Sequence, residues 1–187
     1  MRDAGWEHVK KMSGAAAMFA LLASLLLLNA CTGVPQGVEP VRGFAVDRYT
    51  GTWYEIARFD HSFERGLTNV RADYALRKDG GIDVTNSGFD PGKKVWKKAR
   101  GRGYFIGDPD VGQLKVSFFG PFYGAYNVIA LDRDYAWAIV CGNTRNYLWV
   151  LARTPKLEAP VMTALIEKAK SMGFDTEKLI IVQHEPP

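Results

Sequence analysis

The sequence predicts an all-β protein: an eight-stranded antiparallel up-and-down β-barrel with a C-terminal α-helix packed on its outside and a final short strand. Three observations lead to this fold. Eight runs rich in β-branched and aromatic residues follow one another at near-regular spacing. A short turn joins each run to the next. One run with helical spacing of its apolar residues comes after the eighth.

The chain begins with a leader that has the layout of a secretory signal. Lys10 and Lys11 precede an apolar run from Ala15 to Leu28. This run is shorter than the roughly 20 residues that a transmembrane helix needs. Met12 as an alternative start would leave no positive residue before the run, so Met1 is the preferred start.

The leader ends in Leu28-Asn29-Ala30-Cys31, which resembles the bacterial lipoprotein signal. The resemblance implies that residues 1–30 are removed and that Cys31 carries a diacylglycerol. An ordinary signal peptide cleaved nearby is the alternative. Thr32 stands where an Asp would retain a lipoprotein in the inner membrane, so the resemblance favours anchoring in the outer membrane, with the domain in the periplasm. Residues 31–43, with Pro35, Gly37, Pro40 and Gly43, are predicted to be a lipidated tether.

The domain is expected to span residues 44–187, a length sufficient for one hydrophobic core. Turn signals such as Asp79-Gly80-Gly81 and Asp90-Pro91-Gly92 separate its strands. The predicted strands are 51–60, 69–77, 82–87, 93–106, 114–118, 123–131, 135–141 and 147–153. An eight-stranded barrel has an interior just wide enough for side chains or one small ligand.

The last three of these strands are apolar on both faces, so their outer side needs a cover. The predicted cover is a helix that begins at Pro160 and stops at Gly173, where Val161, Leu165, Ala169 and Met172 recur near helical spacing. A strand-like run at 179–182 is expected to pair with a sheet edge.

The charge of the chain argues against a nucleic-acid partner, and the surroundings of Cys141 argue against a reactive cysteine. The net charge is only +4, and no nucleic-acid motif occurs, so no nucleic-acid partner is expected. The basic residues between Lys93 and Arg102 are either a solvated strand face or a weak attraction to anionic lipid headgroups. Cys141 lies in an apolar run and is expected to be a small buried residue. Neither a metal site nor a cofactor is predicted.

Three short motifs are similar to the signatures of the lipocalin family. Gly51-Thr52-Trp53-Tyr54 matches the first, and Arg153, just after the eighth strand, matches the third. The second is matched only by Asp132. The three occur in the family's order, and the longer phrases around them resemble the bacterial outer-membrane lipocalins, which are themselves lipoproteins. The resemblance implies that Trp53 closes the base of the barrel with Gly51 and that Arg153 stacks on its ring.

Alternation along the strands predicts which side chains line the barrel, once Arg153 is taken to point inward. The predicted wall is apolar and aromatic, with polar groups only at the mouth. Its residues are Tyr74, Val84, Leu114, Val116, Phe118, Tyr126, Val128, Trp137, Ile139, Tyr147 and Trp149.

An apolar wall of this kind suits an alkyl chain. The sequence therefore predicts a lipid-binding lipocalin, not an enzyme, that stores or transports fatty acids or lysophospholipids for membrane biogenesis and maintenance under stress. Complete filling of the barrel by its own aromatic residues is an alternative. An enzyme is a second, with Asp60-His61, expected in a surface loop at the mouth, as the polar pair to check. A third is an interaction protein that self-associates, as a homodimer, through its outer face.

Overall fold

The computed structural model describes residues 32–185. The predicted signal peptide and Cys31 lie outside these residues. The described part belongs to one compact unit that begins at Cys31. No helix within it is long and apolar enough to cross a bilayer.

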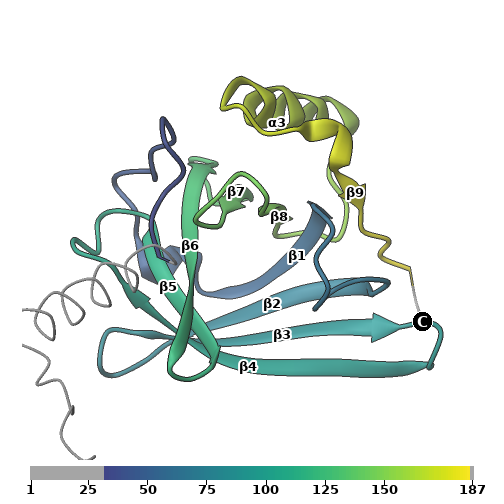
Figure 1. The fold of residues 1–187 in the computed structure, drawn as a ribbon, viewed down its shortest axis with the longest axis horizontal. Helices are drawn as coiled ribbons and strands as arrows, with labels where there is room; N and C mark the ends of the chain where they lie inside the picture. Colours follow the sequence, from purple (N-terminus) through teal and green to yellow (C-terminus); the bar gives the residue numbers. More distant parts are fainter. Residues whose placement is uncertain (1–31, 186–187) are drawn as a thin grey trace, which may run out of the picture. The chain divides into compact units, whose positions relative to one another are not determined.

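Eight strands form the predicted up-and-down barrel, in which every strand is antiparallel to the next (Figure 1). Contact between the first and second strands closes the barrel, so the sheet has few free edges. The strands are β1 (Gly51–Arg58), β2 (Thr68–Leu76), β3 (Ile82–Asp90), β4 (Val95–Phe105), β5 (Gln113–Phe119), β6 (Phe122–Leu131), β7 (Trp137–Cys141) and β8 (Leu148–Ala152).

The two ends of the barrel differ because connections alternate between them. A short helix, α2 (Val46–Tyr49), precedes β1 at one end, which we call the base. The loop between β1 and β2 and the loop between β7 and β8 lie at the other end, the mouth. The final strand, β9 (Ile180–Ile181), pairs with β1 at Ala57 and Arg58, beyond the part of β1 that pairs with β2. The predicted pairing of the last strand with a sheet edge is therefore confirmed.

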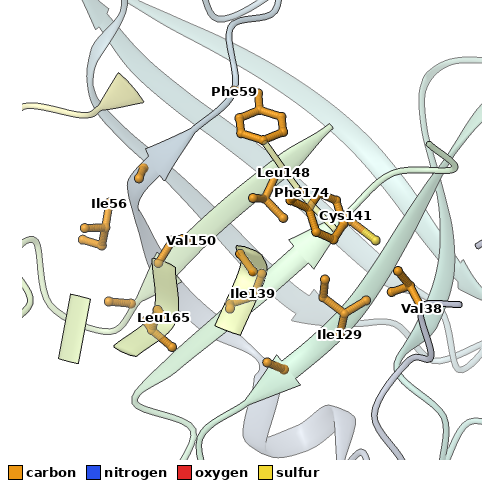
Figure 2. Close-up of a cluster of buried hydrophobic side chains, with 14 residues drawn as sticks. Val38, Ile56, Phe59, Ile129, Ile139, Cys141, Leu148, Val150, Leu165 and Phe174 are labelled. Atoms are coloured by element: carbon orange, nitrogen blue, oxygen red, sulfur yellow. The ribbon is translucent and has the colours of Figure 1, made fainter. Parts of the chain in front are cut away.

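A helix, α3 (Ala159–Ser171), covers the outside of β7 and β8, as predicted (Figure 1). Its Leu165 and Ala169 are buried against outward-facing residues such as Val150 and Ile139 (Figure 2). Gly173 follows with a φ of +82°, a conformation that glycine adopts without strain, and the helix ends there. A single 3-10 turn, η1 (Thr176–Lys178), connects the helix to β9.

Residues 33–43 are not the free tether that their composition suggested. The carbonyl of Gly33 accepts a hydrogen bond from the side chain of Asn127 at 3.1 Å, and that of Gln36 accepts one from Arg145 at 2.7 Å. Val38 is buried in the outer core cluster (Figure 2). This segment therefore belongs to the folded unit, because apolar side chains within a Pro- and Gly-rich run still gain by burial against the barrel.

The predicted inward orientation is wrong for Trp137, Ile139 and Cys141. Ile139 and Cys141 face outward in the cluster that includes Leu165 of α3 (Figure 2), and Trp137 packs against the same cluster. Their neighbours Ala138 and Val140 face the interior instead. Alternation separates the two faces of a strand, but only the register with the next strand decides which face points inward.

Replacing Ile139 with Ala tests this orientation. Ile139 is fully buried beneath α3, so we expect a loss of about 2–4 kcal/mol in the free energy of unfolding, measured by urea denaturation. The exposed Ile181 provides the control, because Ile181→Ala should change stability by less than about 0.5 kcal/mol. Equal effects of the two substitutions would contradict the assigned packing.

Candidate functional site

The base of the barrel is closed by Trp53, which is fully buried. The guanidinium of Arg153 lies 4.0 Å from the centre of its ring, so the predicted stacking is present. Arg153 also donates hydrogen bonds to the carbonyls of Thr52, Arg48 and Tyr135. Gly51 has a φ of +90°, and a Cβ there would come within 3.5 Å of Arg153. Glycine at this position thus permits a backbone conformation that other residues rarely adopt.

Three tyrosines form a layer directly above Trp53. The hydroxyl of Tyr126 lies 2.7 Å from that of Tyr49 and 2.9 Å from that of Tyr74. Tyr49 also stacks on Trp53, with ring centres 4.7 Å apart. Burial raises the pKa of all three hydroxyls, so they remain protonated donors and acceptors. The lower half of the barrel is therefore filled by its own aromatic residues, and a ligand has to lie above this layer.

Most of the residues that alternation predicted belong to the inner cluster or pack against it, and Tyr74 and Tyr126 among them form the layer itself. Val116 and Phe118 are only partly buried and pack against the inner cluster. Tyr147 precedes β8 and lies at the mouth, where its ring stacks on His61 and Trp149. The residues found in the inner cluster or packed against it are Tyr74, Val84, Leu114, Val116, Phe118, Tyr126, Val128 and Trp149.

A buried polar cluster, which the sequence analysis missed, lies between this wall and the mouth. It comprises Glu55, Arg58, His61 and Glu64. Arg58 donates a hydrogen bond to the backbone carbonyl of Glu64 at 2.7 Å, and its Nε lies 3.4 Å from Oε1 of Glu55. Trp149 donates its indole N–H to Glu64 at 3.2 Å. The upper end of the interior is therefore polar rather than uniformly apolar.

The charges of this cluster do not balance if every group is ionised. Burial raises the pKa of Glu55, and nearby Glu64 raises it further. Burial also raises the pKa of Glu64. The single positive charge of Arg58 stabilises one carboxylate, so the other favours its neutral form. The cluster then offers both donors and acceptors. Within residues 32–185, Oε1 of Glu55, Nε of Arg58 and both ring nitrogens of His61 are buried without a hydrogen-bond partner.

The position of His61 differs from the expectation that Asp60 and His61 lie in a surface loop. Asp60 is exposed and pairs with Arg65 at 2.7 Å, as a surface loop would allow, but His61 is only 5% exposed. Its ring packs against those of Phe63, Tyr147 and Trp149. Burial and the neighbouring Arg58 lower the pKa of His61 to about 4, so it is neutral near pH 7. The loop thus folds back into the mouth.

The sequence held a signal for one member of the cluster, Glu55. Glu55 lies two residues after the inward Trp53 and pairs with the inward Leu151, so simple alternation places it inside. Arg58 is inward only because an irregularity between Glu55 and Ala57 shifts the register, which pairs Arg58 with Trp149. Nothing in the sequence marks that irregularity.

The structure also places Asp132 and Cys141, two residues that the sequence analysis singled out. Asp132 accepts hydrogen bonds from the backbone N–H groups of Asp134 and Ala136, so it caps the turn where the second motif departs from the family's pattern. Cys141 is fully buried, and burial raises the pKa of its thiol to about 12, as expected for an unreactive core residue. Among the residues described, no three His, Cys, Asp or Glu side chains are grouped to hold a metal ion.

The lowered pKa of His61 predicts a pH-dependent stability. As the pH falls from about 6.5 to 4, the unfolded chain gains a proton on this residue before the folded chain does, so stability is lost. We expect a loss on the order of 2 kcal/mol across this window, beyond that of the His61→Gln variant. Urea unfolding of both proteins at several pH values measures the difference. Parallel stability curves for the two would refute the assignment.

Comparison with known proteins agrees with this geometry. The sequence model of one protein family, described as a lipocalin-like domain, matches residues 44–184 of this chain. Outer membrane lipoprotein Blc of Citrobacter freundii is 52% identical over 166 residues, which cover 88% of this chain and 94% of that protein. Outer membrane lipoprotein Blc of Escherichia coli K12 is 51% identical over 168 residues, covering 89% and 95%.

A solved structure shows the same fold. Insecticyanin of the tobacco hornworm Manduca sexta superposes with a TM-score of 0.66 at 22% identity, covering 82% of this chain and 87% of that one. The barrel, the Trp53–Arg153 closure and these matches lead to one conclusion. The chain belongs to the lipocalin family.

Proposed function

We propose that this protein is a lipid-binding lipocalin of the outer membrane that binds a single-chain lipid, a fatty acid or lysophospholipid, for membrane biogenesis and maintenance under stress. The observation that carries the proposal is that the apolar side chains of Val116, Phe118 and Trp149 stay partly exposed where they pack against the inner cluster, and that Trp149 joins them to the polar cluster through Glu64. The outer-membrane assignment is supported by the Blc lipoproteins that the chain resembles along most of its length.

The two zones of the interior suit the two parts of such a lipid. Burying about a dozen methylenes at about 0.8 kcal/mol each gives a gross gain near 10 kcal/mol before the costs of ordering the chain. At the mouth side of the wall, Nε of Arg58 lies 3.4 Å from Oε1 of Glu55 and Nε2 of His61 lies 3.5 Å from Oε2 of Glu64, contacts that do not complete a hydrogen bond for any of the Arg58, Glu55 and His61 atoms. Buried polar groups in proteins are nearly always paired, so a headgroup with both donors and acceptors fits this position.

The two other functions have less support. The family is one of binding proteins, so no enzymatic activity is assigned. His61, the polar residue to check for chemistry, stacks among aromatic rings. Self-association as a homodimer stays a prediction, and helix α3 covers the two-sided apolar strands that first suggested it.

Displacement of an apolar fluorescent probe tests ligand binding. We expect a fatty acid or lysophospholipid to displace the probe from the purified protein. Val116→Trp should weaken binding about tenfold or more, because the larger ring occupies the space of the alkyl chain. Ile139→Val, on the outer face, is the matched control and should leave the affinity unchanged. Failure of every single-chain lipid to displace the probe would rule out this function.

Cell fractionation tests the anchor. Cys31→Ala removes the proposed site of acylation, so we expect the protein to leave the membrane pellet when the membranes are washed at high salt, whereas the acylated protein stays. Cys141→Ala leaves the anchor intact and should remain in the pellet. Continued sedimentation of the Cys31→Ala protein with membranes after a high-salt wash, which removes proteins held by charge, would exclude Cys31 as the lipid attachment site.

A further inference from the structure

The packing of the N-terminal segment limits how far the barrel can lie from its lipid anchor. The backbone of Gly33 is held at the outer face of β6 by Asn127, and Pro35 and Val38 are buried beyond it. Only Thr32 separates Gly33 from Cys31. Two residues span at most about 7 Å, so a lipid on Cys31 brings the bilayer surface close to this part of the barrel wall.

The outer face of β4, two strands from β6 in the sheet, carries unpaired positive charge. Arg102 on β4 pairs in register with Ser117 on β5 and Asp83 on β3, on the face opposite to the inward Val84 and Val116. Arg100 lies one step along that face. Both arginines are exposed, and neither forms an ion pair within residues 32–185, whereas Asp83 is already paired with Arg77. Lys115 adds a further charge over the ring of Tyr123.

A groove of about 710 Å³ lies between these side chains, where β5 leaves β4. Gly101 allows the backbones of β4 and β5 to lie close together here, because a Cβ on residue 101 would lie only 2.7 Å from the carbonyl oxygen of Ser117. Two arginines, the hydroxyl-bearing residues Thr85, Tyr104, Ser117 and Tyr123, and Asp83, whose carboxylate pairs with Arg77 at 3.0 Å, line the groove. Guanidinium groups with neighbouring hydroxyl donors are the chemistry that binds a phosphate.

The tip of the adjoining hairpin is apolar. Phe119 and Phe122 are cross-strand partners at the end of β5 and β6, and they are 80% and 78% exposed. Two neighbouring aromatic rings left in water at a hairpin tip, beside a basic face, match the combination that binds membrane interfaces.

We propose that this protein docks on an anionic phospholipid bilayer through one face of the barrel, with a lipid phosphate in the groove and the hairpin tip in the headgroup layer. This docking face consists of Arg100, Arg102, Lys115, Tyr123, Phe119 and Phe122. The geometry of the anchor rests on the proposed acylation of Cys31, but the charge and the aromatic tip act without it.

Vesicle cosedimentation with the unacylated protein tests the docking face. The compact unit begins at Cys31, so residues 31–187 with Cys31→Ser serve as the soluble form. We expect it to sediment with vesicles of phosphatidylcholine and phosphatidylglycerol, but not with phosphatidylcholine alone, and to be released by salt. Arg100→Gln with Arg102→Gln should weaken this binding roughly tenfold to thirtyfold. Phe119→Ser with Phe122→Ser should weaken it as well.

Matched controls are available at the base of the barrel. Lys78→Gln removes an exposed charge and Leu76→Ser an exposed apolar side chain, and neither should alter vesicle binding. The arginine variant should bind lipid inside the barrel as the wild type does, which separates docking from ligand binding. Equal sedimentation with both kinds of vesicle, or equal loss in the base variants, would overturn the docking face while leaving the proposed ligand unaffected.

Hydrogen exchange provides a test that needs no substitution in the face. With the acylated protein reconstituted in the anionic vesicles, backbone amides of residues 98–104 and 115–124 should exchange more slowly than in the soluble form. Those of the base turn at 77–81 should not change. Protection of the base turn instead would show that the opposite end of the barrel faces the membrane.

Discussion

The stacking of Arg153 on Trp53 holds the base of the barrel together. One guanidinium contacts the ring that fills the base and donates to backbone carbonyls from α2, β1 and the turn before β7. Segments more than a hundred residues apart in sequence are thereby joined at one point. Everything that a ligand can contact lies above this point, because the tyrosine layer rests directly on Trp53.

The interior is consequently divided along the barrel axis. The closed base and the hydroxyl layer exclude a ligand from the lower half, and the polar cluster sets the character of the upper end. Buried carboxyls beside a single arginine are costly unless their protonation states adjust or a partner completes their hydrogen bonds. Such a cost at the mouth is consistent with a binding site whose polar groups are satisfied only when it is occupied.

The outside of the barrel is divided as well. Helix α3 and the N-terminal segment cover β6, β7 and β8, where both strand faces are apolar. The outer face of β4 and β5 carries arginines and hydroxyl-bearing residues instead. With the proposed acylation of Cys31, the packing of Gly33 would leave the barrel little slack to rotate on the membrane.

The sequence by itself determined the barrel, its closing residues and the existence of an outer helix, because each depends on local periodicity or on a short motif such as Gly51 to Tyr54. Tertiary structure alone decided which faces of β7 point inward, that Arg58 and His61 enter the interior, and that residues 33–43 pack on the wall. Alternation offers two equivalent faces for each strand, and only the register between strands, with its irregularities, selects one. The packing of the N-terminal segment depends on Asn127 and Arg145, which are distant in sequence. No local pattern could therefore have shown it.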